Sequence, residues 1–215
     1  MKGDIAKIGD RAFGEQRYTA AKMLYSRINN WSKLALTLLK LQDYQNAVDA
    51  AKRAEDVPTW AQVNAACLLA NQISLAKTAG LNLIVLPDEL PKVSEFYQKN
   101  VRIAELIDLL ENGIEHNQAR AYTSKEQNLF THLALIYAKY LWLVEQPGSQ
   151  KLMRFLKSNA DKISIPLVIA DCRKNLLWNE VVYLYILSQE FDQAASEMIK
   201  HPSSFDHRQL LQFCG

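Results

Sequence analysis

Residues 175–202 read NLLWNEVVYLYILSQEFDQAASEMIKHP, and this stretch contains one complete structural unit. Apolar residues recur at the 3.6-residue spacing of a helix from Leu177 to Tyr185 and again from Phe191 to Ile199. The polar residues 188–190 separate the two runs, and Pro202 ends the second, because the residue before a proline is disfavoured in the helical conformation. The stretch therefore predicts two short helices packed back to back.

The second helix begins with a mark that recurs along the chain: an aromatic or aliphatic residue followed three positions later by alanine. In the hairpin we expect Phe191 to fill the space at the turn, and Ala194 and Ala195 to let the two helix axes approach closely. The mark recurs at intervals of roughly thirty residues, at Tyr18, Tyr44 and Ile73, with a weaker copy at Ile103. Two helices in each interval are typical of an α-solenoid. We therefore predict an all-α superhelix of stacked helical hairpins, about 30 residues each, over residues 1–215; an irregular helical bundle is the alternative.

The composition also favours helices. Hydrophobic residues make up 49% of the 215-residue chain, enough for a core that needs neither metal nor disulfide staples. The 7 glycines and 6 prolines are few, and alternating strand patterns are almost absent. Residues 81–91, LNLIVLPDELP, are the exception. We predict a buried extended connector there, because a lone strand beside two prolines has no partner strand.

The sequence favours a cytosolic protein. The first ten residues have no apolar core of the kind that signal peptides contain, and no apolar run approaches the ~18 residues of a membrane span. Cys67, Cys172 and Cys214 are far apart and lie in apolar helical contexts, which is typical of buried thiols in a reducing compartment.

Charge and motifs exclude several classes of function. A formal net charge of +2 lacks the basic excess that a nucleic-acid partner requires. The dispersed glycines form no phosphate-binding loop, and the four histidines lack the i, i+4 spacing and the Cys-x-x-Cys pairs of metal sites. We therefore predict no enzyme activity and no cofactor. His201 is interpreted as a cation near a helix end, and Trp178 as packing in the seam between repeats.

Several blocks of the sequence resemble the clathrin heavy chain family in order and spacing. They begin with IGDRAFGEQRYTAAKMLYSRI (8–28) and LQDYQNAVDAAKRA (41–54), continue through TWAQVNAAC, ISLAKTAGLNLIV and DELPKVSEFYQKN, and end with residues 165–202. The resemblance covers nearly the whole chain, departing from the family pattern at 116–127 and 140–149. It implies a clathrin-heavy-chain-repeat solenoid from the proximal leg of a three-legged scaffold that polymerises around budding vesicles.

The resemblance also implies partners. In that family the proximal leg packs against neighbouring heavy-chain legs and carries the clathrin light chain as a long helix, on the cytoplasmic face of coated vesicles and coated pits, without inserting into the membrane. The β-propeller and the trimerising region of a full heavy chain are absent here. We therefore expect a fragment, open at both ends, that is largely monomeric in isolation.

A second hypothesis is a peptide-binding α-solenoid, an adaptor or a tether of the vacuolar sorting type, whose concave groove holds a short motif. The ordered match to the clathrin family favours the scaffold over this alternative. As a partner-binding surface we propose only Lys52, Arg53 and Trp60, which lie around one turn between helices and could contact an acidic partner helix.

Overall fold

The computed structural model describes residues 2–117, 124–144 and 151–202, and every regular element in these ranges is a helix. The prediction of an all-α fold is confirmed. The chain divides into two compact units, residues 1–113 and 114–215. That residues 1–215 form one continuous solenoid stays a prediction.

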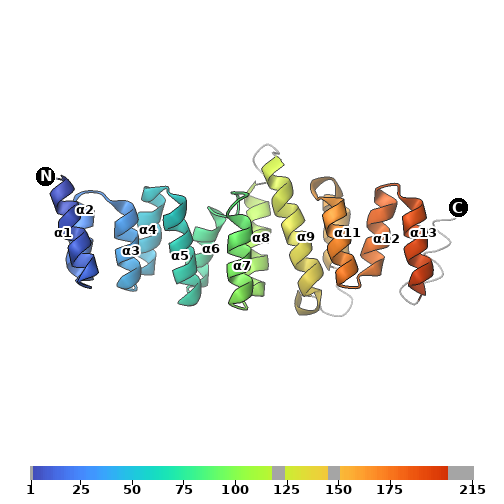
Figure 1. The fold of residues 1–215 in the computed structure, drawn as a ribbon, viewed down its shortest axis with the longest axis horizontal. Coiled ribbons are helices and arrows are strands. Elements are labelled where there is room, and N and C mark those ends of the chain that lie inside the picture. The colour runs from blue at the N-terminus through green and yellow to red at the C-terminus, as the bar shows by residue number, and fades with distance from the viewer. Residues whose placement is uncertain (1, 118–123, 145–150, 203–215) are drawn as a thin grey trace. The chain divides into compact units, whose positions relative to one another are not determined.

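The first unit is built from consecutive helical hairpins (Figure 1). Its helices are α1 (Lys2–Gly14), α2 (Tyr18–Arg27), α3 (Trp31–Lys40), α4 (Tyr44–Ala54), α5 (Val57–Leu69), α6 (Ile73–Leu81), α7 (Leu90–Lys99) and most of α8 (Ile103–Asn117). The closest packing joins α1 to α2, α3 to α4 and α5 to α6. In addition α3 packs on α5 and α4 packs on α6, so that each hairpin stacks on the next.

The second unit contains the helical hairpin of residues 175–202. Its helices are α9 (Ser124–Val144), α10 (Lys151–Asn159), the short 3-10 helix η1 (Ala160–Lys162), α11 (Ile165–Lys174), α12 (Trp178–Leu187) and α13 (Phe191–Lys200). Helix α9 packs against α10 and α11, α11 against α12, and α12 against α13. The backbone of α9 leaves helical geometry at Tyr140, with φ −118° and ψ 24°. The two helices predicted for residues 175–202 are therefore confirmed.

One hydrogen-bond pattern closes seven of the turns between helices. In each, a residue with a left-handed φ of 57° to 62° follows the helix, and the N–H of the next residue donates to the carbonyl five positions earlier, as Arg17 does to Ala12. The carbonyl of that next residue then accepts the first hydrogen bond of the following helix, as Arg17 accepts from Ala21. The left-handed residues are Gln16, Asn29, Gln42, Asn71, Val101, Leu176 and Gln189.

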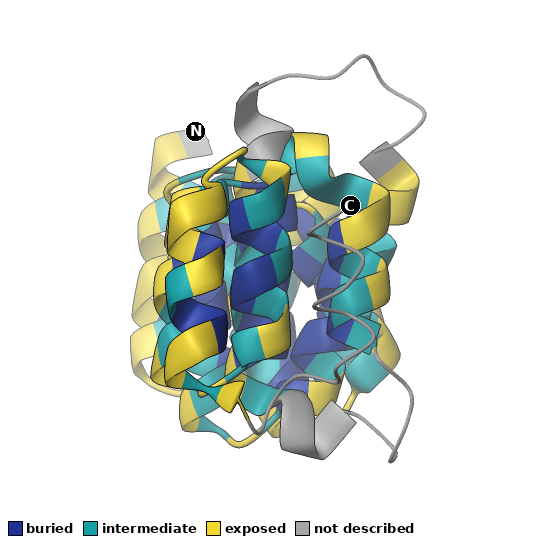
Figure 2. Cartoon of the chain, turned by 90° about the vertical axis from the view of Figure 1, so that its right-hand side faces the viewer, coloured by how far each residue is buried: buried dark blue, intermediate teal, exposed yellow. Residues whose placement is uncertain are grey.

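The recurring mark identifies real helix starts. Tyr18, Tyr44, Ile73, Ile103 and Phe191 are the first residues of their helices, and the alanines three positions later in four of them are 0–3% exposed. Buried residues lie between neighbouring helices, and exposed residues lie on their outer faces (Figure 2). The expectation for Phe191 is wrong, because its side chain is 61% exposed and does not fill the turn. The expectation for Ala195 is wrong as well, because Ala195 is exposed and only Ala194 is buried at the helix contact. In this hairpin the alanine of the mark is buried and the large residue is exposed, whereas at Ile103 the large residue is itself buried, at 6% exposed.

Residues 82–89 are buried in part but are not extended. The N–H groups of Leu83 and Ile84 both donate to the carbonyl of Gly80, and the segment continues as turns up to α7. Both side chains are at most 2% exposed. The prediction of an extended connector is wrong, because the segment closes the end of α6 and buries Leu83 and Ile84 without pairing as a strand.

Trp178 lies inside its own hairpin. Its indole stacks on the imidazole of His201, from the start of α12 to the residue after α13, with ring centroids 3.6 Å apart. This contact lies within one hairpin, and the interpretation of Trp178 as packing in the seam between repeats stays a prediction. His201 does lie at the helix end, where its N–H donates to the carbonyl of Glu197.

Candidate functional site

Polar side chains join helices that are two apart in the chain, and these contacts tie one hairpin to the next. In the first unit Lys22 of α2 pairs with Asp43, the residue before α4, at 3.3 Å. Lys77 of α6 pairs with Asp108 of α8 at 2.8 Å. Further links of the same kind join Ser32 to Asp56, Asp10 to Lys33 and, in the second unit, Arg173 to Glu197. Each link fixes the register of two stacked elements.

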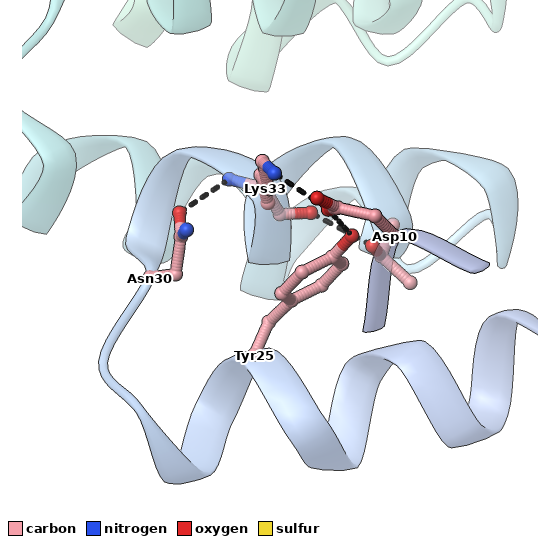
Figure 3. A network of polar contacts seen from close by, with 5 residues as sticks. Asp10, Tyr25, Asn30 and Lys33 are labelled. Carbon is pink, nitrogen blue, oxygen red and sulfur yellow. Dashed lines mark hydrogen bonds and ion pairs between the residues drawn. The ribbon is translucent and has the colours of Figure 1, made fainter. Parts of the chain in front are cut away.

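Asp10 accepts two hydrogen bonds that connect three helices. The Tyr25 hydroxyl donates at 2.7 Å and the Lys33 ammonium at 2.5 Å, and both side chains point toward Asp10 from α2 and α3 (Figure 3). The bond from Lys33, followed by that from Tyr25, holds the pKa of Asp10 below its ordinary value. Burial, with the bond to Asp10, raises the pKa of Tyr25. The network therefore stays in one protonation state near neutral pH, with Asp10 charged and Tyr25 neutral.

The buried side-chain amide of Asn64 links α5 to α6 and α7 by hydrogen bonds. The Asn64 side chain, 2% exposed, donates to the carbonyl of Ala76 at 2.8 Å and to the Tyr97 hydroxyl at 3.0 Å. Burial raises the pKa of Tyr97 to about 12. Because buried polar groups are costly unless they are hydrogen-bonded, these two contacts select one packing of the three helices.

The link in the second unit is a nearly buried carboxylate. Glu197 is 4% exposed, and its Oε1 lies 2.6 Å from the Arg173 guanidinium and 3.5 Å from the Lys200 ammonium. The Arg173 guanidinium also lies over the Tyr185 ring, 5.4 Å from its centroid. Arg173 therefore connects α11 to both α12 and α13.

A groove of about 240 Å³ opens between α2 and α4, with α3 as its floor. Trp31, Leu34 and Leu38 supply the apolar floor. Lys22 and Ser26 line the side formed by α2, whereas Asn46, Asp49, Ala50 and Arg53 line the side formed by α4. The Arg53 guanidinium covers Trp31 at 4.7 Å from the ring centroid.

The three residues proposed as a partner surface differ in their exposure to solvent. Lys52 and Arg53 are exposed at the end of α4, where Lys52 pairs with Asp49 at 3.4 Å. Trp60, by contrast, is 7% exposed within α5, so its indole is packed inside the protein and offers little area to a partner. The binding role of these residues stays a prediction. The aromatic residue that the structure places beside Arg53 is Trp31.

The described residues provide little reactive chemistry. Among residues 2–117, 124–144 and 151–202 there is no cluster of three or more histidine, cysteine or acidic side chains that could hold a metal ion. Burial raises the pKa of Cys67 to about 11 and that of Cys172 to about 12, which keeps both thiols protonated and poorly nucleophilic. Cys214 lies outside the described residues. Within the same described ranges, no helix is long and apolar enough to cross a membrane.

Comparison with known proteins decides the family. The family model described as "Region in Clathrin and VPS" matches residues 2–75 and 81–213. The chain belongs to the clathrin repeat family. Clathrin repeats thus account for the stacked hairpins of both units, and the match extends over almost the whole sequence.

Curated relatives from distant organisms share this clathrin repeat region. The chain is 41% identical over 208 residues to clathrin heavy chain 2 of Oryza sativa subsp. japonica, which covers 96% of this chain and 11% of that protein. It is 38% identical over 205 residues to a probable clathrin heavy chain of Schizosaccharomyces pombe, covering 95% of this chain and 12% of that protein. For the clathrin heavy chain of Drosophila melanogaster the identity is 36% over 200 residues, covering 93% and 11%. The chain thus spans about a tenth of the length of the relatives it matches.

Proposed function

We propose that this chain is a structural scaffold segment of a vesicle coat, equivalent to part of the proximal leg of a clathrin heavy chain. The observation that carries the proposal is the match, across nearly the whole chain, to clathrin heavy chains of plants, a fungus and an animal. A scaffold segment acts through its shape and stiffness, not through a reactive group. On this proposal the chain has no catalytic function and takes no cofactor.

The polar links between alternate helices support a mechanical role. A stack of hairpins is held together by contacts between neighbouring repeats only, so its stiffness depends on each seam. Two pairs join the first hairpin, α1 and α2, to the second. Asp10–Lys33 starts from α1, and Lys22–Asp43 starts from α2. Two links on different helices resist both sliding and rotation of one hairpin on the next.

We further propose that the partners are neighbouring heavy-chain legs and a clathrin light chain, and that the protein works on the cytoplasmic face of coated vesicles and coated pits. Lys52 and Arg53 remain our suggested contacts for an acidic partner helix. Many weak contacts summed over several legs would stabilise a lattice without strong binding by any single segment. The tether of the vacuolar sorting type is not our proposal, because the relatives described above are named as clathrin heavy chains.

The test begins with the native protein in its own cytosol. An antibody against residues 2–117 is used for immunoprecipitation, and the coated-vesicle fraction is probed after sedimentation. We expect the antigen in the vesicle fraction, together with one stoichiometric acidic light chain. Pre-incubation of the antibody with the purified chain is the control. An antigen confined to the soluble fraction, with no heavy or light chain recovered beside it, contradicts the proposal.

A further inference from the structure

The groove between α2 and α4 has the size of a single side chain. Its volume of about 240 Å³ lies below the roughly 300–1,000 Å³ of pockets that enclose small-molecule ligands. The floor formed by Trp31, Leu34 and Leu38 is apolar, and the groove is partly open to solvent. These properties suit an apolar side chain of a peptide better than a free metabolite.

Arg53 stands at the rim of this groove with its hydrogen-bond donors unused. Among residues 2–117, 124–144 and 151–202, its guanidinium has a contact with the Trp31 ring and no hydrogen-bond or ion-pair acceptor. The guanidinium carbon lies 4.7 Å from the centroid of the Trp31 ring, which places Arg53 beside the apolar floor of the groove. A guanidinium offers paired N–H donors that match the two oxygens of a carboxylate.

The other charges around the groove are neutralised within the protein. Lys22 pairs with Asp43 at 3.3 Å, and Asp43 also accepts from Asn46 at 2.8 Å. Asp49 pairs with Lys52 at 3.4 Å. Arg53 is therefore the unmatched charge at the groove, and its complement is a single negative group placed beside the apolar floor.

We propose that the groove between α2 and α4 docks a short peptide segment of a protein partner, in which an apolar side chain is followed by a carboxylate. The apolar side chain lies on Trp31, Leu34 and Leu38, and the carboxylate accepts a two-pronged hydrogen bond from Arg53. The site belongs to the first unit alone and does not depend on the coat role. It gives the scaffold a place to hold a flexible acidic segment, and while that segment is bound Arg53 is not available to the acidic partner helix suggested above.

The probe is an N-acetylated, C-amidated tetrapeptide with the sequence Gly-Phe-Asp-Gly, titrated to millimolar concentration into the isotope-labelled full chain and followed by amide chemical shifts. We expect saturable shifts confined to α2, α3 and α4. The matched neutral peptide, Gly-Phe-Asn-Gly, is expected to bind at least about tenfold more weakly, because a hydrogen bond to a charged group contributes that much or more.

Three variants locate the interaction. Arg53→Gln and Arg53→Lys are expected to weaken binding of the acidic peptide about tenfold or more, since lysine keeps the charge but loses the planar pair of donors. Arg11→Gln, which removes an arginine from the last turn of α1 away from the groove, is the matched control and should leave binding unchanged. Circular dichroism verifies that each variant retains its helices.

Several results overturn the proposal. One is the absence of saturable shifts at millimolar peptide, and another is equal binding of the acidic and neutral peptides. Equal weakening by Arg11→Gln and Arg53→Gln would indicate general charge attraction in place of a defined site. Tighter binding of a short single-stranded RNA than of the acidic peptide would also overturn it.

Discussion

The guanidinium of Arg173 in α11 lies 2.6 Å from the carboxylate of Glu197 in α13, although only 5% of the Glu197 side chain is exposed. A carboxylate this deeply placed is tolerated because its charge is paired and hydrogen-bonded. The pair therefore makes the packing of three helices in the second unit depend on one arginine.

The first prediction concerns that pair. Arg173→Met should lower the free energy of unfolding by about 2–3 kcal/mol, because the nearly buried Glu197 loses its main partner, while Lys200 compensates in part. The double variant Arg173→Met/Glu197→Leu should recover most of the loss. Urea unfolding of the four proteins of this double-mutant cycle measures both effects. A double variant as unstable as the sum of the single variants would show that the two residues do not interact.

The second prediction concerns Gly80, where α6 approaches α8. A Cβ at this position would lie 2.8 Å from Cδ2 of Leu109 and 3.0 Å from Nδ2 of Asn64. Leu109 is fully buried and Asn64 is held by two hydrogen bonds, so neither can move freely. Gly80→Ala should therefore destabilise the protein by about 1–3 kcal/mol, despite the better helix propensity of alanine.

The matched control for this substitution is Gly14→Ala in α1. Nothing lies within 4 Å of a Cβ at Gly14, so alanine should be neutral or slightly stabilising there. Thermal unfolding followed by circular dichroism compares the two variants. Equal midpoints for Gly80→Ala and the parent chain would rule out the close approach of α6 and α8.

The third prediction uses the turn between α7 and α8. Val101 has a φ of 57° and is 82% exposed, so a β-branched residue occupies a left-handed conformation without burying its side chain. Val101→Asn should raise the free energy of unfolding by about 1 kcal/mol, because asparagine adopts this conformation at lower cost. The urea midpoint is the measurement.

Met23→Asn serves as the control for the loss of an exposed apolar side chain. Met23 is 71% exposed within α2, where asparagine has a lower helix propensity. We expect a slight loss of stability there, in contrast to the gain at Val101. A gain at both sites would mean that removal of apolar surface, and not relief of backbone strain, explains the effect.

The fourth prediction concerns the loss of folding stability at low pH. The pKa of Asp10 lies below its ordinary value of 3.8, chiefly because Lys33 and Tyr25 donate to it. The stabilisation from Asp10 is therefore fully present above about pH 4 and is lost as the pH falls through the lowered folded-state pKa. In Asp10→Asn this part of the acid sensitivity should disappear.

Urea unfolding at several pH values between 3 and 6, an interval chosen to bracket the ordinary pKa of an aspartate, measures the dependence. The midpoint of the parent chain should fall more steeply at the acid end than that of Asp10→Asn. Lys33→Met, which removes the ammonium that donates to Asp10 but keeps the carboxylate, should make this fall shallower as well. Parallel curves for the parent and Asp10→Asn would contradict the role of this network.

The starts of the helices could be predicted from the sequence because each depends on a local signal. Ala21, Ala47 and Ala76 are small residues placed where a helix meets its neighbour, and their spacing gave the repeat. The shape of residues 82–89 could not be predicted in this way. Their aliphatic residues resemble a strand, but hydrogen bonds to the Gly80 carbonyl draw them into turns.

The candidate site was predictable only in part. Arg53 is exposed, as a partner-binding residue must be, whereas Trp60 is buried. The aromatic residue that lies beside Arg53 is Trp31, more than twenty positions earlier in the chain. The links from Asp10 to Lys33 and from Lys22 to Asp43 depend on which faces of the helices stack on one another. A single charged residue in a helical sequence does not indicate which face will meet a neighbouring helix. A search for opposite charges on the facing sides of alternate helices could have found them once the hairpins were phased.

The seven turns with one hydrogen-bond pattern are closed by backbone atoms, and none has glycine at its left-handed position. The side chains of Gln16, Asn29 and Gln42 can therefore be exchanged without removing any of the hydrogen bonds that define their turns. Cysteines introduced there would accept spectroscopic labels at known places in the first two hairpins. Distances between such labels, recorded before and after the protein meets its partners, would show directly whether the stack bends under assembly.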